Sequence, residues 1–365
     1  MSRARQAVVL AGGKGTRLRP LTNARPKPLL PVLGRPCVEY VIEAMAEAGV
    51  EEVFLTCGYR AEDMVEALGS GDQFGVEIIM CFEDVPAGTA GAVKLLEDRL
   101  EDTFIVASGD VLADVDVRSL VDQHVRTGAM ATMALTTVER PEEFGIVGLD
   151  DAGRIERFKE KPRTEEVFSN LINAGIYVLE RDVLPEIPRG EMYDFSKQLF
   201  PKLLAAGQPL YGARLGGLWK DIGRPHDLLD ANILMAERRG RAIEVAGAEC
   251  NGRIVATSFS AGGCRIDGPA YIGGAVSIGH GARLSSCAVG SGTDIGDGSE
   301  VSGSFLMEGC SLGSHCQIAG SLLGGQRHGG RRRRAEGLRA GRRGAGREGR
   351  QAARPDIRVG SPTLK

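Results

Sequence analysis

The sequence predicts an α/β domain with a mainly parallel sheet and helices on both faces, followed by a short parallel β-helix. Two observations carry this prediction. Strand and helix signals alternate over the first 240 residues, and after residue 250 apolar residues recur every five or six positions. The chain has 365 residues, of which 42% are hydrophobic and 25% charged, so it can bury one large core or two ordinary ones.

The alternating part yields six strands and six helices. The predicted strands are 6–11, 53–57, 76–82, 104–108, 130–138 and 173–179, and the predicted helices are 37–48, 61–68, 89–98, 117–126, 196–206 and 225–239. This order is typical of a Rossmann-like sheet with helices on both faces. In such a sheet the ligand binds beyond the carboxyl ends of the strands.

A glycine-rich turn follows the first predicted strand. Gly12, Gly13 and Gly15 come after an apolar run, where a backbone must bend sharply and approach a ligand closely. Residues 10–32 also contain five basic residues and no acidic one: Lys14, Arg17, Arg19, Arg25 and Lys27. Because backbone N–H groups in such a turn bind anions, we expect a polyphosphate ligand.

Two familiar phosphate-binding motifs do not fit this segment. A P-loop needs Gly-Lys-Ser/Thr, which the chain lacks, and the dinucleotide fingerprint opens a helix, whereas four prolines between residues 26 and 36 keep this chain extended. The segment instead resembles the signature of the sugar nucleotidylyltransferases, G-G-x-G-T-R-L-x-P-L-T followed by K-P-L-L-P-V. The resemblance extends over about residues 6–323.

The resemblance implies roles for the residues of this segment. Arg17 and Lys27 would be catalytic, together with Lys161, by neutralising the leaving pyrophosphate and holding the attacking phosphate. The nucleotide would bind to eight residues: Leu10, Ala11, Gly12, Gly13, Gly15, Thr16, Gly88 and Thr89.

Two aspartates are candidates for a metal site. Asp110 follows a predicted strand in Ser-Gly-Asp, and Asp221 stands in Trp-Lys-Asp-Ile-Gly before the helix that begins at Pro225. Taken alone, each aspartate fits a hard divalent cation or a turn or helix cap. Both match the metal-binding aspartates of the family, so the resemblance implies that they hold Mg²⁺.

The segments Phe158–Pro162 and Asn173–Tyr177 read E-K-P and N-A-G-I-Y at their centres. By itself Glu-Lys-Pro is typical of a solvated loop. Both segments are similar to family elements that bind the sugar 1-phosphate. The resemblance implies that Glu160 accepts hydrogen bonds from sugar hydroxyls, Lys161 meets the phosphate, and Asn173 and the backbone at Gly145 complete the pocket.

The segment from Pro86 to Ala92 bears on the choice of nucleotide. Its P-x-G-T-A-G-A pattern resembles mannose-1-phosphate guanylyltransferases more than thymidylyltransferases, although Thr89 is also a fair helix N-cap. We therefore expect GTP and mannose 1-phosphate to give GDP-mannose and pyrophosphate. A glucose-1-phosphate thymidylyl- or uridylyltransferase and a regulatory homologue without turnover remain alternatives, but the complete charged set favours an enzyme.

The C-terminal apolar residues close a repeat every 17 residues. They fall at Ile272, Ile278, Leu284, Val289, Ile295, Val301, Leu306, Leu312, Ile318 and Leu323, in steps of six, six and five. The pattern resembles the left-handed β-helix often attached to this family. Its only histidines, His280 and His315, could serve an acetyltransferase as base, but both fall at polar turn positions. We expect instead a scaffold that builds a homo-oligomer.

Charge separates the tail from the body. Residues 325–365 contain 12 Arg, one Lys and three acidic residues, a net charge of +10, so the body carries about −13 of the total of −3. An acidic body argues against nucleic acid as partner. We read the tail either as a disordered basic segment or, preferably, as the product of a reading-frame shift.

The chain also lacks an apolar stretch long enough to span a membrane, and we expect a cytoplasmic enzyme. The predicted division is a nucleotidylyltransferase domain over 1–240, a β-helix over 250–324 and the tail over 325–365.

Overall fold

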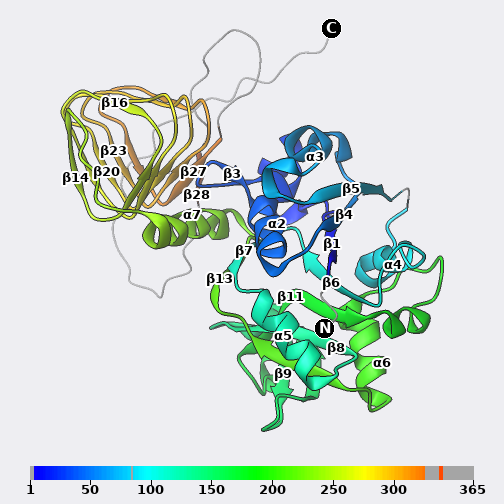
Figure 1. Cartoon of the computed structure of the whole chain (residues 1–365). Coiled ribbons are helices and arrows are strands. Elements are labelled where there is room, and N and C mark those ends of the chain that lie inside the picture. Colours follow the sequence, from blue (N-terminus) through cyan, green and yellow to red (C-terminus); the bar gives the residue numbers. More distant parts are fainter. Residues whose placement is uncertain (1–3, 84, 325–336, 340–365) are drawn as a thin grey trace, which may run out of the picture.

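The computed structural model describes residues 4–83, 85–324 and 337–339 of the chain (Figure 1). It contains an α/β domain and a β-helix, joined by one long helix, so the predicted fold class is confirmed. The predicted tail lies outside the described residues, except for the short strand β28 (Gly337–Arg339), which pairs antiparallel with β27 (Ser321–Leu323).

The central sheet has nine strands. Seven run in the order β10-β9-β11-β6-β1-β4-β5, and β8 and β12 extend the sheet from β11. Their bounds are β1 Gln6–Leu10, β4 Glu52–Cys57, β5 Glu77–Phe82, β6 Thr103–Ser108, β8 Ala131–Thr137, β9 Gly145–Leu149, β10 Ile155–Glu160, β11 Leu171–Glu180 and β12 Leu210–Arg214. The half around β1 is parallel, whereas β11 runs antiparallel to β6, β8 and β9.

Helices cover both faces of this sheet, as Figure 1 shows. Their bounds are α1 Leu21–Ala24, α2 Cys37–Ala48, α3 Ala61–Leu68, α4 Gly88–Lys94, α5 Arg118–Thr127, α6 Phe200–Ala205 and α7 Pro225–Arg239. Along β1, Ala7 and Val9 pack with α2 and α3 on one face, and Val8 packs with α4 and α6 on the other. This alternation follows from the two-residue period of a strand buried on both faces.

All six predicted strands and all six predicted helices have counterparts whose ends lie within four residues of the expected ends. Seven strands of the domain were not predicted: β9, β10 and β12, the pair β7 (Val111–Val115) and β13 (Gly217–Asp221), and the two-residue pair β2 (Pro31–Val32) and β3 (Arg35–Pro36). These strands are short, and β10 and β13 carry charged residues with little apolar alternation, so local pattern does not mark them.

The C-terminal part is a β-helix of three parallel sheets. Its strands are β14 Ala248–Asn251, β15 Ile254–Ala256, β16 Phe259–Ala261, β17 Cys264–Asp267, β18 Ala270–Ile272, β19 Val276–Ile278, β20 Arg283–Ser285, β21 Ala288–Val289, β22 Asp294–Ile295, β23 Glu300–Ser302, β24 Phe305–Leu306, β25 Ser311–Leu312, β26 Gln317–Ala319 and β27. Ile272 pairs with Val289 and Ile278 with Ile295, so the predicted 17-residue coil is confirmed.

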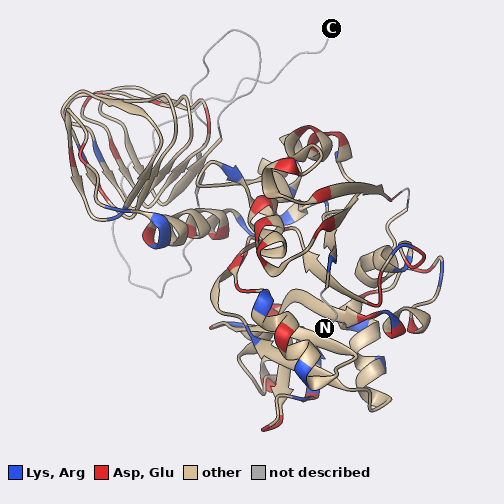
Figure 2. Cartoon of the chain, in the orientation of Figure 1, with Lys and Arg blue, Asp and Glu red and all other residues tan. Residues whose placement is uncertain are grey.

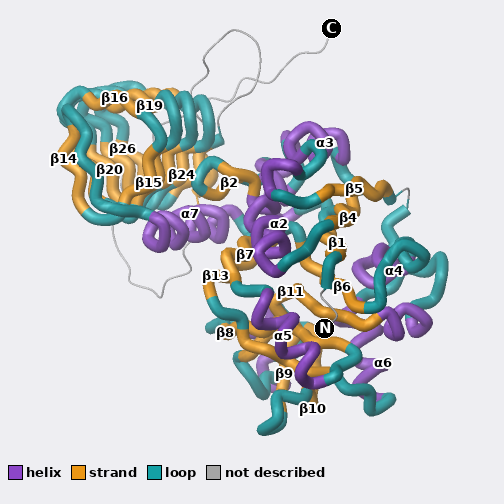
Figure 3. The backbone as a smooth tube through the Cα atoms, in the orientation of Figure 1, coloured by secondary structure: helices purple, strands orange, loops and turns teal. Residues whose placement is uncertain are grey.

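The helix α7 lies between the β-helix and the α/β domain (Figure 3). It contacts β15, β18, β21 and β27 on one side and β2 (Pro31–Val32) and β13 on the other. Its buried residues Leu228, Ala231 and Met235 join one apolar cluster with residues from both parts. The two parts therefore share a continuous core.

Charged residues of both signs are interspersed over the α/β domain, as Figure 2 shows. At the end of α7, for example, Arg238 and Arg239 both pair with Asp114. Among the described residues, no helix combines the length and the apolar character that crossing a membrane requires.

Candidate active site

The two candidate metal ligands lie side by side because of a strand pairing that the sequence did not reveal. Asp110 sits in the turn between β6 and β7, and β13 runs antiparallel to β7 with Asp221 opposite Val111. The ammonium of Lys27 meets both carboxylates: its Nζ lies 2.7 Å from Oδ2 of Asp110 and 3.5 Å from Oδ1 of Asp221. Lys27 begins the short 3-10 helix Lys27–Leu29.

This cluster is electrostatically unusual because it is largely buried. Lys27 is 7% exposed. Burial opposes its charge, but the carboxylates of Asp110 and Asp221 outweigh burial and raise the pKa of Lys27. Burial also raises the pKa of the Asp221 carboxyl, and Lys27 offsets this only in part. Lys27 alone therefore does not balance the two carboxylates, and a second cation beside them would stabilise their ionised forms.

The glycine-rich turn leads from β1 toward this cluster. Gly15 has φ +58°, and a Cβ there would lie 2.9 Å from Thr22 Cγ2 and 3.0 Å from Lys27 Cβ, so only glycine fits the position without strain. The Thr22 hydroxyl donates to the Gly15 carbonyl at 2.9 Å. The turn thus rests on the same segment that carries Lys27, while Gly13 and Thr16 are exposed.

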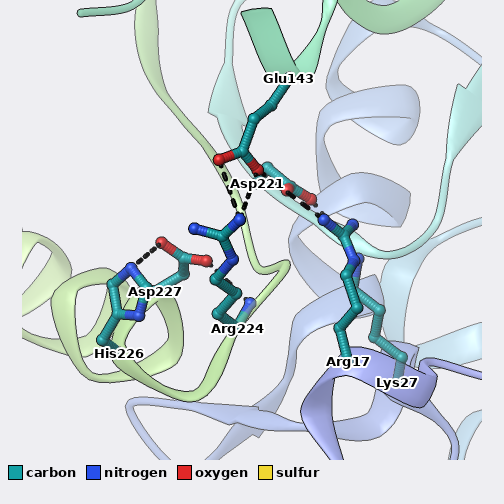
Figure 4. Close-up of polar contacts among 7 residues, drawn as sticks. All are labelled: Arg17, Lys27, Glu143, Asp221, Arg224, His226 and Asp227. Atoms are coloured by element: carbon teal, nitrogen blue, oxygen red, sulfur yellow. Dashed lines mark hydrogen bonds and ion pairs between the residues drawn. The ribbon is translucent and has the colours of Figure 1, made fainter. Parts of the chain in front are cut away.

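Arg17 is exposed, and Figure 4 shows its guanidinium near Asp221 and directed toward Glu143. Its Nη1 is 3.9 Å from Oε2 of Glu143, and Glu143 also accepts hydrogen bonds from Arg224 at 2.9 and 3.1 Å. A Cβ at Gly223 would lie 2.7 Å from Asp221 Oδ2 and 3.3 Å from Arg17 Nη2. Arg17 therefore borders Asp221. Sequence reasoning missed both Glu143 and Arg224, whose positions depend on contacts distant in sequence.

The predicted base-binding segment is fixed to the loop around residue 193. The amides of Ala90 and Gly91 both donate to the Tyr193 carbonyl at 2.9 Å. A Cβ at Gly88, which has φ +77°, would lie 2.7 Å from that same oxygen. Thr89 Oγ1 bonds the Asp194 carboxylate and the amide of Phe195. This segment is thus held by backbone and hydroxyl contacts.

Glu83 is a further acidic residue here, and sequence reasoning missed it. Its carboxylate accepts a hydrogen bond from the Ala87 amide at 3.3 Å. A Cβ at Gly12 would lie 3.4 Å from its Oε1, so the carboxylate reaches from the Pro86–Ala92 segment to the glycine-rich turn. Its place between two sheet-edge loops follows from the parallel pairing of β1, β4 and β5, and no local motif marks it.

The predicted sugar-pocket residues gather at the antiparallel half of the sheet. Glu160 pairs with Gly145 across β9 and β10, and a Cβ at Gly145 would lie 2.8 Å from Glu160 Oε2. Burial raises the pKa of the Glu160 carboxyl. Lys161 has φ +44° and donates its amide to the Phe144 carbonyl.

The side-chain amide of Asn173 is fixed from three sides. Its nitrogen donates to the Tyr177 hydroxyl at 2.9 Å and to Ser196 Oγ at 3.1 Å, and its oxygen accepts from the Gly175 amide at 2.9 Å. These contacts set the orientation of the amide without needing a ligand. Asn173 therefore lies in a fixed orientation beside Tyr177 and Ser196.

The carboxylates of Asp110 and Asp221 can supply only part of the oxygen ligands of a Mg²⁺ ion. Within the described part of the chain, no group of three or more His, Cys, Asp or Glu residues could hold a metal. Two carboxylates such as Asp110 and Asp221 are a sufficient protein contribution when substrate phosphates and water supply the other oxygens, as is usual for Mg²⁺. The residues present therefore fit the ion.

The two histidines of the β-helix lie apart from this cluster. His280 and His315 are exposed turn residues two coils apart in the stack, with the turn at Asp297 between them. His280 Nδ1 lies 3.0 Å from the Gly262 carbonyl, and its amide bonds the Asp297 carboxylate.

A family model and several known proteins are similar to this chain over most of its length. The family model described as nucleotidyl transferase matches residues 6–238. A UTP–glucose-1-phosphate uridylyltransferase from Synechocystis is 35% identical over 76% of this chain and 76% of its own length. A mannose-1-phosphate guanylyltransferase from Mycobacterium tuberculosis is 36% identical over 78% of this chain and 79% of its own length.

Two further proteins are similar over shorter parts. A mannose-1-phosphate guanyltransferase from Saccharomyces cerevisiae is 40% identical over 63% of this chain and 64% of its own length. A crystal structure of a protein assigned as glucose-1-phosphate thymidylyltransferase from Bacillus anthracis superimposes with a TM-score of 0.59 and 28% identity, covering 66% of this chain and 97% of that one.

Proposed function

The chain belongs to the nucleotidyl transferase family and is a sugar-1-phosphate nucleotidyltransferase, and from this premise we propose that it uses GTP and mannose 1-phosphate. The products are GDP-mannose and pyrophosphate. The observation that carries the chemistry is the Lys27 ammonium between Asp110 and Asp221, next to the glycine-rich turn.

In the proposed reaction, a phosphate oxygen of the sugar 1-phosphate attacks the α-phosphorus of the nucleotide, and pyrophosphate leaves. The protein supplies position and charge rather than a nucleophile. Arg17, which is exposed, neutralises the leaving pyrophosphate, and Lys27 and Lys161 hold the attacking phosphate. Backbone groups of Leu10, Ala11, Gly12 and Gly13 receive the nucleotide.

Asp110 and Asp221 hold Mg²⁺ in this proposal, and the ion neutralises phosphate charge when bound. On the sugar side, Glu160 accepts hydrogen bonds from hydroxyls. The raised pKa of its carboxyl is compatible with this role, because the protonated and the ionised forms of a carboxyl both have acceptor oxygens. Asn173 and the Gly145 backbone complete the sugar contact. We assign the transfer to residues 1–240 and assembly of a homo-oligomer to the β-helix over 250–324.

The choice of GTP is supported by Glu83. An ionised carboxylate only accepts hydrogen bonds, and it has two oxygens with which to do so. The edge of guanine carries two neighbouring donors, N1–H and the N2 amino group, so a carboxylate matches guanine in two bonds. Uracil and thymine offer one donor between two acceptors, which would leave an oxygen of Glu83 facing an oxygen.

A second candidate substrate pair is UTP or dTTP with glucose 1-phosphate. The 35% identity to a glucose-1-phosphate uridylyltransferase over three quarters of each chain favours it, as does the superposition on the thymidylyltransferase structure. This pair predicts that Glu83 plays no part in base selection.

A pyrophosphate-release screen distinguishes the two. The purified chain is assayed with five nucleoside triphosphates against the 1-phosphates of mannose, glucose, galactose and N-acetylglucosamine, with Mg²⁺ present. The proposal expects the highest kcat/KM for GTP with mannose 1-phosphate. A higher value for UTP or dTTP with glucose 1-phosphate would replace it by the second candidate.

A further inference from the structure

One outer face of the β-helix is apolar and buried. On the sheet formed by β18, β21, β24 and β27, the inward residues are Ile272, Val289, Leu306 and Leu323, and the residue before each points to the opposite side of the strand. These outward residues are Tyr271, Ala288, Phe305 and Leu322, at most 5% exposed. Outward positions of a β-helix normally face water, so this ladder has a covering partner.

The covering partner includes the segment that follows the glycine-rich turn. The ladder shares one apolar cluster with Leu18, Leu21 and Leu33, all from the first 33 residues, and with α7. The approach is close at Gly34, where a Cβ would lie 2.1 Å from the Tyr271 hydroxyl. The segment that carries Arg17 and Lys27 therefore rests on the β-helix as well as on its own domain.

An ion pair adds a directional contact to this packing. Arg25 Nη2 lies 2.8 Å from Oε2 of Glu308, a residue in the turn after β24. Arg25 is 20% exposed at its side chain and Glu308 37%. Because 283 residues separate the two, the contact exists only when the β-helix is docked.

Arg25 occupies a central position in the segment. It follows α1 and stands two residues before Lys27, whose ammonium meets Asp110. Three residues earlier, Thr22 bonds the Gly15 carbonyl through its hydroxyl and the Tyr59 hydroxyl through its own carbonyl. A shift of Arg25 would thus be transmitted to the glycine turn on one side and to Lys27 on the other.

We propose that the docked β-helix positions the nucleotide-binding turn, and that Glu308, acting through Arg25, is a positioning residue for nucleotidyl transfer. Neither side chain touches the reacting atoms in this role. The inference rests on the proposed function only in taking residues 10–27 as the nucleotide site, and it holds for either base.

The proposal separates activity from stability. An ion pair that remains partly exposed contributes little to folding, whereas small displacements of a phosphate-binding loop cost activity steeply, up to about 10²-fold for 1 Å. We therefore expect Glu308→Gln and Arg25→Ala to raise KM for the nucleotide about 10-fold, with a smaller effect on the KM for the sugar phosphate.

The experiment uses the full chain and five variants. Glu308→Gln, Arg25→Ala, their combination and the charge exchange Arg25→Glu with Glu308→Arg are compared with Glu300→Gln as a matched control. Glu300 is a β-helix carboxylate that pairs with Arg283 at 3.7 Å within the β-helix itself. Steady-state constants are measured with the best substrate pair of the screen, and melting temperatures are recorded for every protein.

The proposal expects the two single variants to lose the same factor, the combination to lose no more than either, and the charge exchange to recover at least part of the loss. Glu300→Gln should match the wild type. The proposal would be overturned if the nucleotide KM were equal in the wild type and Glu308→Gln. It would also be overturned if the combined variant lost the product of the two single losses, or if the loss of activity in each variant simply paralleled its drop in melting temperature.

Hydrogen exchange supplies a readout that does not require turnover. Without substrate, amides of residues 13–25 should exchange faster in Glu308→Gln than in the wild type or Glu300→Gln. Unchanged exchange in residues 13–25 would overturn the positioning role, whether or not the protein turns over any substrate pair. A lack of turnover with every substrate pair would count against the proposed function and not against the positioning role.

Discussion

Lys27 Nζ lies 2.7 Å from Oδ2 of Asp110, although 83 residues separate them in the chain. The contact joins the glycine-rich segment after β1 to the carboxyl end of β6, which is the neighbour of β1 in the sheet. It places a buried cation against the acids that we assign to Mg²⁺, so the protein holds opposite charges ready at one point. Catalysis by position and charge requires this kind of fixed arrangement.

Removing one carboxylate tests the metal pair. Asp221→Asn keeps the size of the side chain but removes a charge, so we expect kcat/KM to fall at least about 10²-fold, since electrostatic groups of an active site typically contribute that much. Asp110→Asn should behave alike. Asp116→Asn, an exposed aspartate that accepts a hydrogen bond from the Ser119 amide, serves as control. Turnover near the wild-type level in either site variant would refute the assignment.

Arg17→Ala tests the exposed cation near Asp221. Its side chain is 60% exposed and its ion pair with Glu143 is 3.9 Å long, so its removal should leave the melting temperature within about 2 °C of the wild type. Turnover should nevertheless fall about 10²-fold because the leaving pyrophosphate loses its partner. Arg283→Ala, whose side chain is 72% exposed on the β-helix, is the matched control. An unfolded Arg17→Ala protein with normal activity per folded molecule would make Arg17 structural.

Glu83→Gln tests the reading of the base. The amide offers one donor and one acceptor, which matches a donor–acceptor pair on the edge of uracil or thymine but can bond only one of the two neighbouring guanine donors, N1–H and N2–H. We expect kcat/KM for GTP to drop about 10- to 100-fold, the range of one lost bidentate contact, while the value for UTP or dTTP rises. The ratio of the two constants is the quantity to measure. A ratio unchanged by the substitution would remove Glu83 from base selection.

His124 predicts how stability depends on pH. It is 2% exposed, with Nδ1 2.9 Å from Thr132 Oγ1 and Nε2 2.8 Å from Glu180 Oε1. Burial lowers the pKa of His124 below 6.5, although Glu180 opposes the shift. The unfolded chain therefore binds the proton more readily, so this contribution to stability is present above pH 6.5 and is lost as pH falls toward the lowered pKa.

The check is the melting temperature between pH 7.5 and 5.5. The melting temperature of the wild type should fall further over this range than that of His124→Gln, in which the side chain at position 124 does not titrate. His226→Gln, at a partly exposed histidine beside Asp227, is measured in parallel for comparison. Equal slopes in wild type and His124→Gln would contradict the lowered pKa.

The sequence predicts more of the fold than of the candidate active site. Elements with a strong period, such as α2, α7 and the 17-residue coil, could be predicted because the period is set by local geometry. The antiparallel pairing of β13 with β7 could not, since it joins residues more than 100 positions apart, and yet it alone brings Asp221 beside Asp110.

Other contacts could have been found by a closer pattern. Tyr271, Ala288, Phe305 and Leu322 repeat at 17 residues just as the inward series does, one position earlier. Two adjacent apolar series in a β-helix indicate that one outer face is covered. Which segment covers it, and that Arg25 would meet Glu308 there, depends on how the two parts pack and has no local signal.

The most direct test of the account is to follow the α-phosphorus. The enzyme is given GTP labelled at the α-phosphate with mannose 1-phosphate and Mg²⁺, and the label is traced in the products. The account predicts label in GDP-mannose, unlabelled pyrophosphate in equal amount, and a rate at least about 10²-fold lower in Asp110→Asn. Absence of labelled sugar nucleotide with every triphosphate and sugar 1-phosphate of the screen, or an equal rate in Asp110→Asn, would contradict it.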